Sequence, residues 1–233
     1  MKNKILILNG NMYDNAVANL GKMVYTVKAF LDTPEEFKLV LFTGGEDVSP
    51  QMYGHTSPQH RCMHNLKRDL QELEVFQLAK KHRIKMTGIC RGSQFLNVMN
   101  GGWLMHHINR HSGETHDMTT ATGETFKVTS THHQMCVPAA TGSVIGWSTS
   151  RRSDIYIGNA DLPCVYTGPE TEAIWYPETL CAAVQYHPEY MPEDSNGYLW
   201  YHTLVTDLLC MSAAEFTEKY VNAQTKSALT ANV

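Results

Sequence analysis

The chain has 233 residues, of which 42% are hydrophobic and 18% are charged. This composition is that of a globular protein and excludes an intrinsically disordered one. The formal net charge of −4 disfavours nucleic acid and anionic membranes as partners. The 6 cysteines include no Cys-x-x-Cys pair, so the sequence predicts neither a disulfide scaffold nor a zinc knuckle.

The apolar segment near the N-terminus, residues 5–8, ends at Asn9 and Gly10. It is too short for the core of a signal peptide. A membrane-spanning helix needs roughly 18 apolar residues in a row, and we expect none here. The sequence therefore predicts a protein of the reducing cytoplasm.

Three short apolar segments, residues 5–8, 39–42 and 84–89, each end close to a glycine-containing turn. Short strands that alternate with helical patterns are typical of a parallel α/β sheet. Apolar residues at helical spacing predict a helix over residues 65–82, and its basic end suits the helix dipole. The segment SQFLNVMN predicts a second helix that ends at Asn100, before two glycines.

The middle of the chain, residues 105–170, is rich in His, Thr, Ser and Gly. Its short alternating pieces predict loops and a small antiparallel extension of the sheet, not a second domain. Two further strands are expected at residues 172–176 and 181–186, followed by a helix near residues 198–209.

The sharpest local signal is Gly88-Ile89-Cys90-Arg91-Gly92, between a predicted strand and a predicted helix. It matches the nucleophile elbow, with Cys in place of the usual Ser. The turn would place the sulfur at a helix N-terminus, which favours the thiolate, and would point the backbone N–H of Arg91 at a developing oxyanion. A buried structural cysteine between incidental glycines is the alternative for these five residues.

A thiolate nucleophile needs a base, and the base needs an acceptor that orients it. His187 and Glu189 follow the second late strand, with Pro188 between them, and Glu189 could reach back to the imidazole. A third element, Gly44-Gly45, follows the strand at 39–42 and can present bare N–H groups to an anion. All three elements lie at the carboxyl ends of predicted strands, where open α/β sheets bind ligands.

Several motifs that occur in one order carry a resemblance to a known family. They are FTGGEDVSPQMYG, RDLQE, GICRGSQFLNVMNGG, STHHQ, EAIWYPE and AVQYHPE, and they span residues 38–190 approximately. Together they resemble the class I glutamine amidotransferase-like superfamily, in its γ-glutamyl hydrolase branch (peptidase C26, the γ-glutamyl-GABA hydrolase type). Tyr186 stands where the family usually has Trp before His-Pro-Glu, and the segment between the first strand and Gly44 is shorter than usual.

The resemblance implies a fold and a set of functional residues. The implied fold is a flavodoxin-like α/β domain, with a mostly parallel central sheet flanked by helices, over residues 1–222, and we expect a frayed tail over residues 223–233. The implied catalytic triad is Cys90, His187 and Glu189, the implied oxyanion hole is formed by Gly45 and Arg91, and the implied substrate contacts are Gln94 and His132.

Four histidines in the middle of the chain raise the question of a metal site. Their spacings do not form one helical face, and no acidic pattern repeats among them. We therefore expect neither a metal nor a cofactor. The residues are His106, His107, His111 and His116.

The first functional hypothesis is a cysteine hydrolase that cleaves the γ-glutamyl amide bond of a small compound through a thioester. The first alternative is a glutaminase subunit that delivers ammonia to a separate synthetase chain. The second is a catalytically idle binding protein on the same fold. Expected partners are a γ-glutamyl compound or glutamine, and either a synthetase chain or a second copy of this chain.

Overall fold

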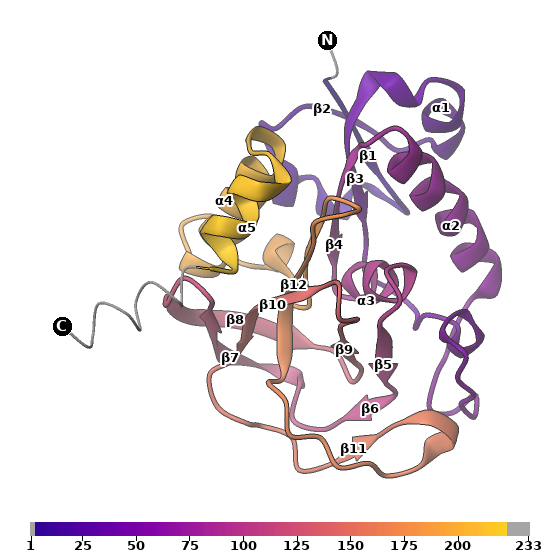
Figure 1. Ribbon diagram of the computed structural model, residues 1–233, viewed down its shortest axis with the longest axis vertical. Coiled ribbons are helices and arrows are strands. Elements are labelled where there is room, and N and C mark those ends of the chain that lie inside the picture. Colours follow the sequence, from indigo (N-terminus) through magenta and orange to yellow (C-terminus); the bar gives the residue numbers. More distant parts are fainter. Residues whose placement is uncertain (1–2, 223–233) are drawn as a thin grey trace.

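A nine-stranded mixed sheet runs through the computed structural model, which describes residues 3–222 (Figure 1). In chain order its strands are β1 (Lys4–Ile7), β2 (Lys22–Val24), β3 (Phe37–Phe42), β4 (Lys85–Ile89), β7 (Ser112–Thr120), β8 (Thr125–Thr131), β10 (Ser143–Ser148), β12 (Thr171–Tyr176) and β13 (Cys181–Val184). Across the sheet they follow the order β2-β1-β3-β4-β13-β12-β10-β7-β8.

The sheet has a parallel part and an antiparallel part. Strands β2, β1, β3, β4 and β13 run parallel, whereas β12, β10, β7 and β8 each pair antiparallel with the preceding strand of the order. This confirms the predicted α/β fold with an antiparallel extension. Two small sheets pair β5 (Trp103–Met105) with β9 (Met135–Val137) and β6 (His107–Ile108) with β11 (Tyr156–Ile157).

Helices cover both faces of the sheet. Figure 1 shows α1, α2 and α3 on one side and α4 and α5 on the other. Their bounds are α1 (Val27–Asp32), α2 (Leu66–Lys81), α3 (Arg91–Met99), α4 (Asn196–Cys210) and α5 (Ala213–Tyr220).

Two hydrophobic cores lie between the sheet and the two helical layers. Side chains of a strand point alternately to opposite faces. Accordingly, Ile5 and Ile7 of β1 pack in the core that contains Tyr201 of α4, whereas Leu6 packs in the core that contains Phe76 of α2. Burial on both faces explains why this strand is a continuous apolar run in the sequence.

The predicted helix over residues 65–82 is α2, which begins after Asn65 because the Asn65 side chain accepts a hydrogen bond from the backbone N–H of Arg68. The predicted helix near 198–209 is α4. We did not predict α1, β2 or α5. A signal for α5 was present, since Ser212 and Glu215 form a capping box before it.

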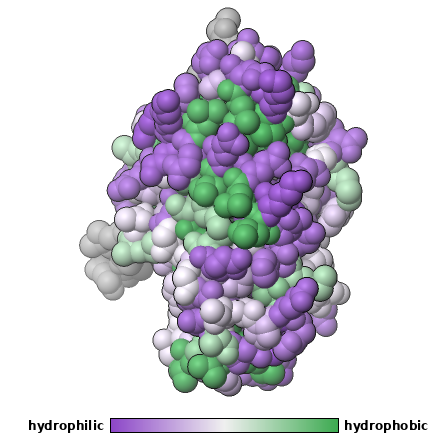
Figure 2. All heavy atoms as spheres, turned by 90° about the vertical axis from the view of Figure 1, so that its right-hand side faces the viewer, coloured by the Kyte–Doolittle hydropathy of each residue, from purple (hydrophilic) through white to green (hydrophobic). Residues whose placement is uncertain are grey.

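The face covered by α1 and α2 combines apolar and polar side chains. Figure 2 shows apolar side chains gathered between hydrophilic ones on this side of the molecule. Exposed apolar side chains of α2 include Leu66 and Leu70. Within residues 3–222, no helix is both long and apolar enough to span a bilayer. The tail expected to be frayed, residues 223–233, lies outside the described residues.

Candidate active site

Cys90 lies between β4 and α3 in a backbone conformation that L-residues seldom adopt. Its φ is 53° and its ψ is −110°, and its side chain is mostly buried. The neighbouring glycines permit this turn, because a Cβ on Gly92 would collide with the carbonyl oxygen of Phe42 in β3. Strained backbone of this kind is concentrated at functional sites. The structure therefore has the strand–turn–helix geometry of a nucleophile elbow at Cys90, whose role as a nucleophile stays a prediction.

His187 and Glu189 follow β13, the strand directly beside β4. Nδ1 of His187 lies 2.6 Å from Oε1 of Glu189, and both side chains are buried. The backbone around them is fixed as well, because the N–H of His187 donates to Oγ1 of Thr129 at 2.8 Å and the Asn15 side chain donates to the carbonyl oxygen of Glu189 at 2.8 Å. The carboxylate thus holds the imidazole in one orientation and leaves Nε2 for another partner.

Cys90 is the partner on the other side of His187. Burial alone would lower the pKa of His187, but hydrogen bonds with Cys90 and Glu189 raise that pKa to about 10. The ring of Tyr190 stacks on the imidazole, with the ring centroids 5.0 Å apart. The Cys90 thiol, the His187 imidazole and the Glu189 carboxylate therefore form one hydrogen-bonded chain. This arrangement can supply a thiolate nucleophile and a general acid.

The Gly44-Gly45 turn packs against this hydrogen-bonded chain from the end of β3. A Cβ on Gly44 would lie 3.1 Å from Cε1 of His187 and 3.7 Å from Cβ of Cys90. Gly45 has a φ of 132°, which favours glycine. Gly45 and Arg91 directly follow Gly44 and Cys90, which lie close together, and their role as an oxyanion hole stays a prediction.

A buried network of charged side chains contacts the Gly44-Gly45 turn and the elbow. The Arg91 side chain, for which the sequence indicated no role, pairs with both Asp69 and Glu72 of α2. Glu72 also accepts from Nε of Arg68 at 2.8 Å. Nη2 of Arg68 in turn donates to the carbonyl oxygens of Thr43 and Gly44 at 3.1 and 3.0 Å. The network ties α2 to the elbow and to the Gly44-Gly45 turn.

Tyr13 is a residue of the site that sequence reasoning missed. Its hydroxyl oxygen accepts a hydrogen bond from the backbone N–H of Gly44 at 3.0 Å. Burial and the nearby Glu189 raise the pKa of the Tyr13 phenol, so it is neutral. No motif surrounds it in the sequence, since it reaches the site from an isolated turn after β1.

Gln94 and His132, the predicted substrate contacts, are both buried beside the site. The Gln94 side chain lies one turn into α3 and donates to Oε1 of Gln185 at 3.2 Å. The His132 side chain contacts the carbonyl oxygen of Gln134 at 2.8 Å and faces Glu172. Substrate contact by either residue stays a prediction.

The four histidines considered as metal ligands separate into different places. His106 contacts His55 through ring nitrogens 3.2 Å apart, and the His107 ring lies against that of His133. His111 and His116 do meet, and they meet at buried carboxylates of β12 and the segment before it. The sequence around the four histidines has no repeated acidic pattern, and the acidic partners come instead from Glu170 and Glu172, just before and within β12. Burial opposes protonation of His111, but Glu170 and Glu172 raise its pKa to about 9.

The mixed sheet and its cysteine elbow define a class I glutamine amidotransferase-like protein with a cysteine-type site. The Peptidase C26 family model matches residues 21–152, and the chain belongs to that family.

Relatives and solved structures agree with this assignment. A glutamine amidotransferase-like protein from Lactococcus lactis is 30% identical over 170 residues, which cover 64% of this chain and 65% of the relative. Protein NtpR of Enterococcus hirae is 39% identical over 84 residues, covering 36% of this chain and 34% of that protein. The chain therefore spans between about a third and two thirds of the length of these two relatives.

Two structures from Thermotoga maritima show the same fold. A glutamine amidotransferase superposes with a TM-score of 0.53 at 15% identity, covering 97% of this chain and 93% of that one. A chain of PurLQS superposes with a TM-score of 0.57 at 14% identity, covering 88% of this chain and all of that one. At these identities the likeness concerns the fold alone.

Proposed function

We propose that the protein is a cysteine hydrolase that cleaves γ-glutamyl amide bonds of small compounds. The observation that carries this proposal is the hydrogen-bonded chain from Cys90 through His187 to Glu189, with Nδ1 of His187 2.6 Å from the carboxylate. Membership of the peptidase C26 family supports cysteine-type hydrolase or amidotransferase chemistry in general. The γ-glutamyl specificity rests on the motif resemblance.

In the first half of the reaction, Sγ of Cys90 attacks the side-chain carbonyl carbon of the substrate. Negative charge then develops on the carbonyl oxygen, which the backbone N–H groups of Gly45 and Arg91 would stabilise. His187 carries a proton because the pKa of its imidazole is raised to about 10, and it gives that proton to the leaving nitrogen. The C–N bond breaks, a free amine departs and a γ-glutamyl thioester remains.

In the second half, His187 accepts a proton from a water molecule that attacks the thioester carbonyl. The C–S bond breaks and releases glutamate and the Cys90 thiol. Glu189 stabilises the imidazolium in both halves, because its carboxylate contacts the nitrogen that does not face the sulfur. The chemistry needs no group beyond these residues and water.

We place the amine part of the substrate in a neighbouring cavity. A cavity of about 440 Å³ begins at Glu46, directly after Gly45. It is lined by Glu46, Ser57, Gln59, Met63 and His64. This mostly polar lining suits a small polar amine better than an extended apolar group.

The test is turnover by the purified chain alone, measured as glutamate release from glutamine and from a panel of γ-glutamyl amines. We expect clear turnover of at least one γ-glutamyl amine and weaker hydrolysis of glutamine. In Cys90→Ala the rate should fall by on the order of 10⁴–10⁶. The matched control is Cys62→Ala, because Cys62 is also buried and burial raises the pKa of its thiol to about 12.

Two outcomes contradict the proposal. Turnover retained by Cys90→Ala would overturn the mechanism. Glutaminase activity that appears only after a synthetase chain is added, with every γ-glutamyl amine inert, would favour the amidotransferase subunit instead.

A further inference from the structure

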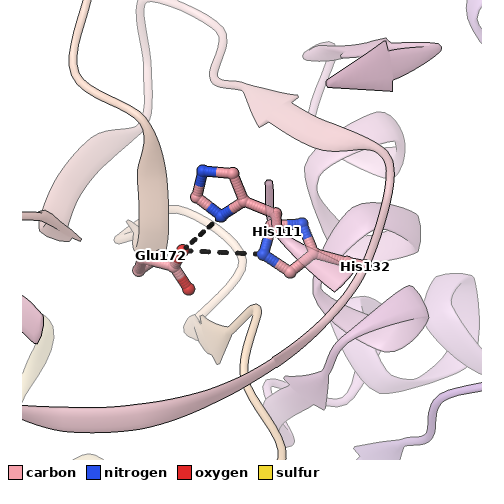
Figure 3. Close-up of side chains that lie close together, drawn as sticks. All are labelled: His111, His132 and Glu172. Carbon is pink, nitrogen blue, oxygen red and sulfur yellow. Dashed lines mark ion pairs between the residues drawn. The ribbon is translucent and has the colours of Figure 1, made fainter. Parts of the chain in front are cut away.

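Glu172 of β12 is a buried carboxylate that three imidazoles approach without a well-formed hydrogen bond. Its side chain has no exposed surface, and neither carboxylate oxygen has a hydrogen-bond partner among the described residues. Nδ1 of His111 and Nε2 of His132 each lie 3.5 Å from its Oε1 (Figure 3). A buried carboxylate needs a cation beside it, and either a protonated imidazole or a metal ion can supply that charge.

The other ring nitrogens of these two histidines are already engaged. Nε2 of His111 lies 3.1 Å from Oε2 of Glu170, and Nδ1 of His132 lies 2.8 Å from the carbonyl oxygen of Gln134. Both partners are acceptors, so each of these nitrogens holds a hydrogen in either protonation state of the ring. The opposite nitrogens, Nδ1 of His111 and Nε2 of His132, both face Oε1 of Glu172. An ion bound between these three atoms would replace any proton on the two facing nitrogens.

We propose that His111, His132 and Glu172 bind one divalent transition-metal ion in a solvent-excluded structural site. Two imidazoles and one carboxylate form a donor set that suits Zn²⁺. The three ligand atoms lie within 4.8 Å of one another, and the two 3.5 Å separations match the roughly 3.4 Å between ligands that sit about 2.1 Å from a tetrahedral ion. Metal-bound histidines typically donate their second N–H to a carboxylate or a backbone carbonyl, as His111 and His132 do here.

His116 is a further imidazole at Glu172, outside the three residues whose ligand atoms all lie within 4.8 Å of one another. Its Nε2 lies 2.9 Å from Oε1 of Glu172, and neither of its ring nitrogens has a hydrogen-bond partner in the described part of the chain. It is almost fully buried, like the other members of the cluster. A closed site of this kind is structural, since a catalytic metal keeps a position open to water or substrate.

The position of the ligands indicates what the ion would do. His111 precedes β7, His132 follows β8 and Glu172 belongs to β12, so one ion would join three strands of the antiparallel part. The carbonyl oxygen of Glu172 accepts from the N–H of Gln185, two residues before His187. The ion would therefore stabilise the strand pair that carries the proposed general acid, without touching the reacting atoms.

The experiment is a calorimetric titration of the chelator-treated full chain with Zn²⁺, made in Cys90→Ala so that the thiol and His187 cannot bind the ion together. We expect one equivalent to bind, with affinity reduced at least tenfold by His111→Asn and by Glu172→Gln. The matched control is His60→Asn, because His60 is an exposed histidine and its loss should leave binding unchanged. Absence of binding, or equal affinity in all of these proteins, would overturn the proposal.

Two further measurements use protein that keeps His111, His132 and Glu172. Their outcome does not depend on whether the substituted variants fold. Free Zn²⁺ at a hundred times Kd should raise the Tm by roughly 5 °C or more, because the ion binds the folded state. Co²⁺ in its place should give the visible absorption of a tetrahedral site without a thiolate charge-transfer band. An unchanged Tm, or a spectrum that shows thiolate ligation, would contradict the assignment.

Discussion

Nη2 of Arg68 donates a hydrogen bond to the carbonyl oxygen of Gly44 at 3.0 Å, and so connects α2 to the turn that faces Cys90. The same guanidinium is paired with Glu72 through its Nε at 2.8 Å. Because Gly44 precedes Gly45 directly, this contact sets where the Gly45 N–H points. Arg68 is thus a positioning residue for the proposed oxyanion hole.

The first prediction concerns this contact. Arg68→Met should lower kcat by about tenfold to a hundredfold with little change in KM, because a misplaced oxyanion donor acts mainly in the transition state. Steady-state kinetics on the best γ-glutamyl substrate measure the effect. Lys67→Met is the control, since Lys67 is an exposed neighbour on α2. An unchanged kcat in folded Arg68→Met would show that the turn keeps its position without the guanidinium.

The second prediction tests the strain at the elbow. At a φ of 53° a residue with a Cβ costs about 1–3 kcal/mol that glycine avoids. Cys90→Gly should therefore be more stable than Cys90→Ala by about 1 kcal/mol in urea unfolding, although both are inactive. The matched pair is Cys136→Gly and Cys136→Ala, where the backbone has no positive φ and alanine should be the more stable. If the stability difference between the glycine and alanine variants is the same at positions 90 and 136, the backbone at Cys90 is not strained.

The third prediction concerns Glu189. Glu189→Gln should lower kcat by about a hundredfold or more, yet by less than Cys90→Ala, because the imidazolium loses its carboxylate while the nucleophile stays. KM should change little, since the interaction matters most when His187 is charged. Glu193→Gln is an exposed control from the following segment. If Glu189→Gln keeps the wild-type kcat, the site is a dyad of Cys90 and His187.

The fourth prediction is a pH dependence of stability. The pKa of His187 is about 10 in the folded protein, above its ordinary value of 6.5, so the folded state binds this proton more tightly than the unfolded state does. Its contribution to the free energy of unfolding is therefore complete below pH 6.5 and is lost as the pH rises towards 10. Urea unfolding at pH 6, 8 and 10 should show wild type losing its advantage over His187→Asn across this window. A difference that stays constant or grows with pH would contradict the raised pKa.

Local signals in the sequence were sufficient for the elbow and for β1, β3, β4 and β13 of the parallel part of the sheet, but not for β2. Cys90 lies between glycines, at the end of an apolar strand, and a nucleophile elbow depends only on such neighbouring residues. Because open α/β sheets bind ligands at the carboxyl ends of their strands, the sequence likewise predicts His187 and the Gly44-Gly45 turn at the same edge of the sheet. The family motifs, which lie within about 150 residues of the chain, added Gln94 and His132 as expected substrate contacts.

Only the tertiary structure decided which distant polar groups are neighbours. Tyr13 reaches Gly44 from a turn with no motif, and Arg91 is paired with acids of α2. The histidine cluster is the clearest case, because His111 and Glu172 are 61 positions apart along the chain and meet only when β12 enters the sheet beside β10. Periodicity and spacing describe one element at a time, whereas a buried charge needs a partner from whichever strand packs against it.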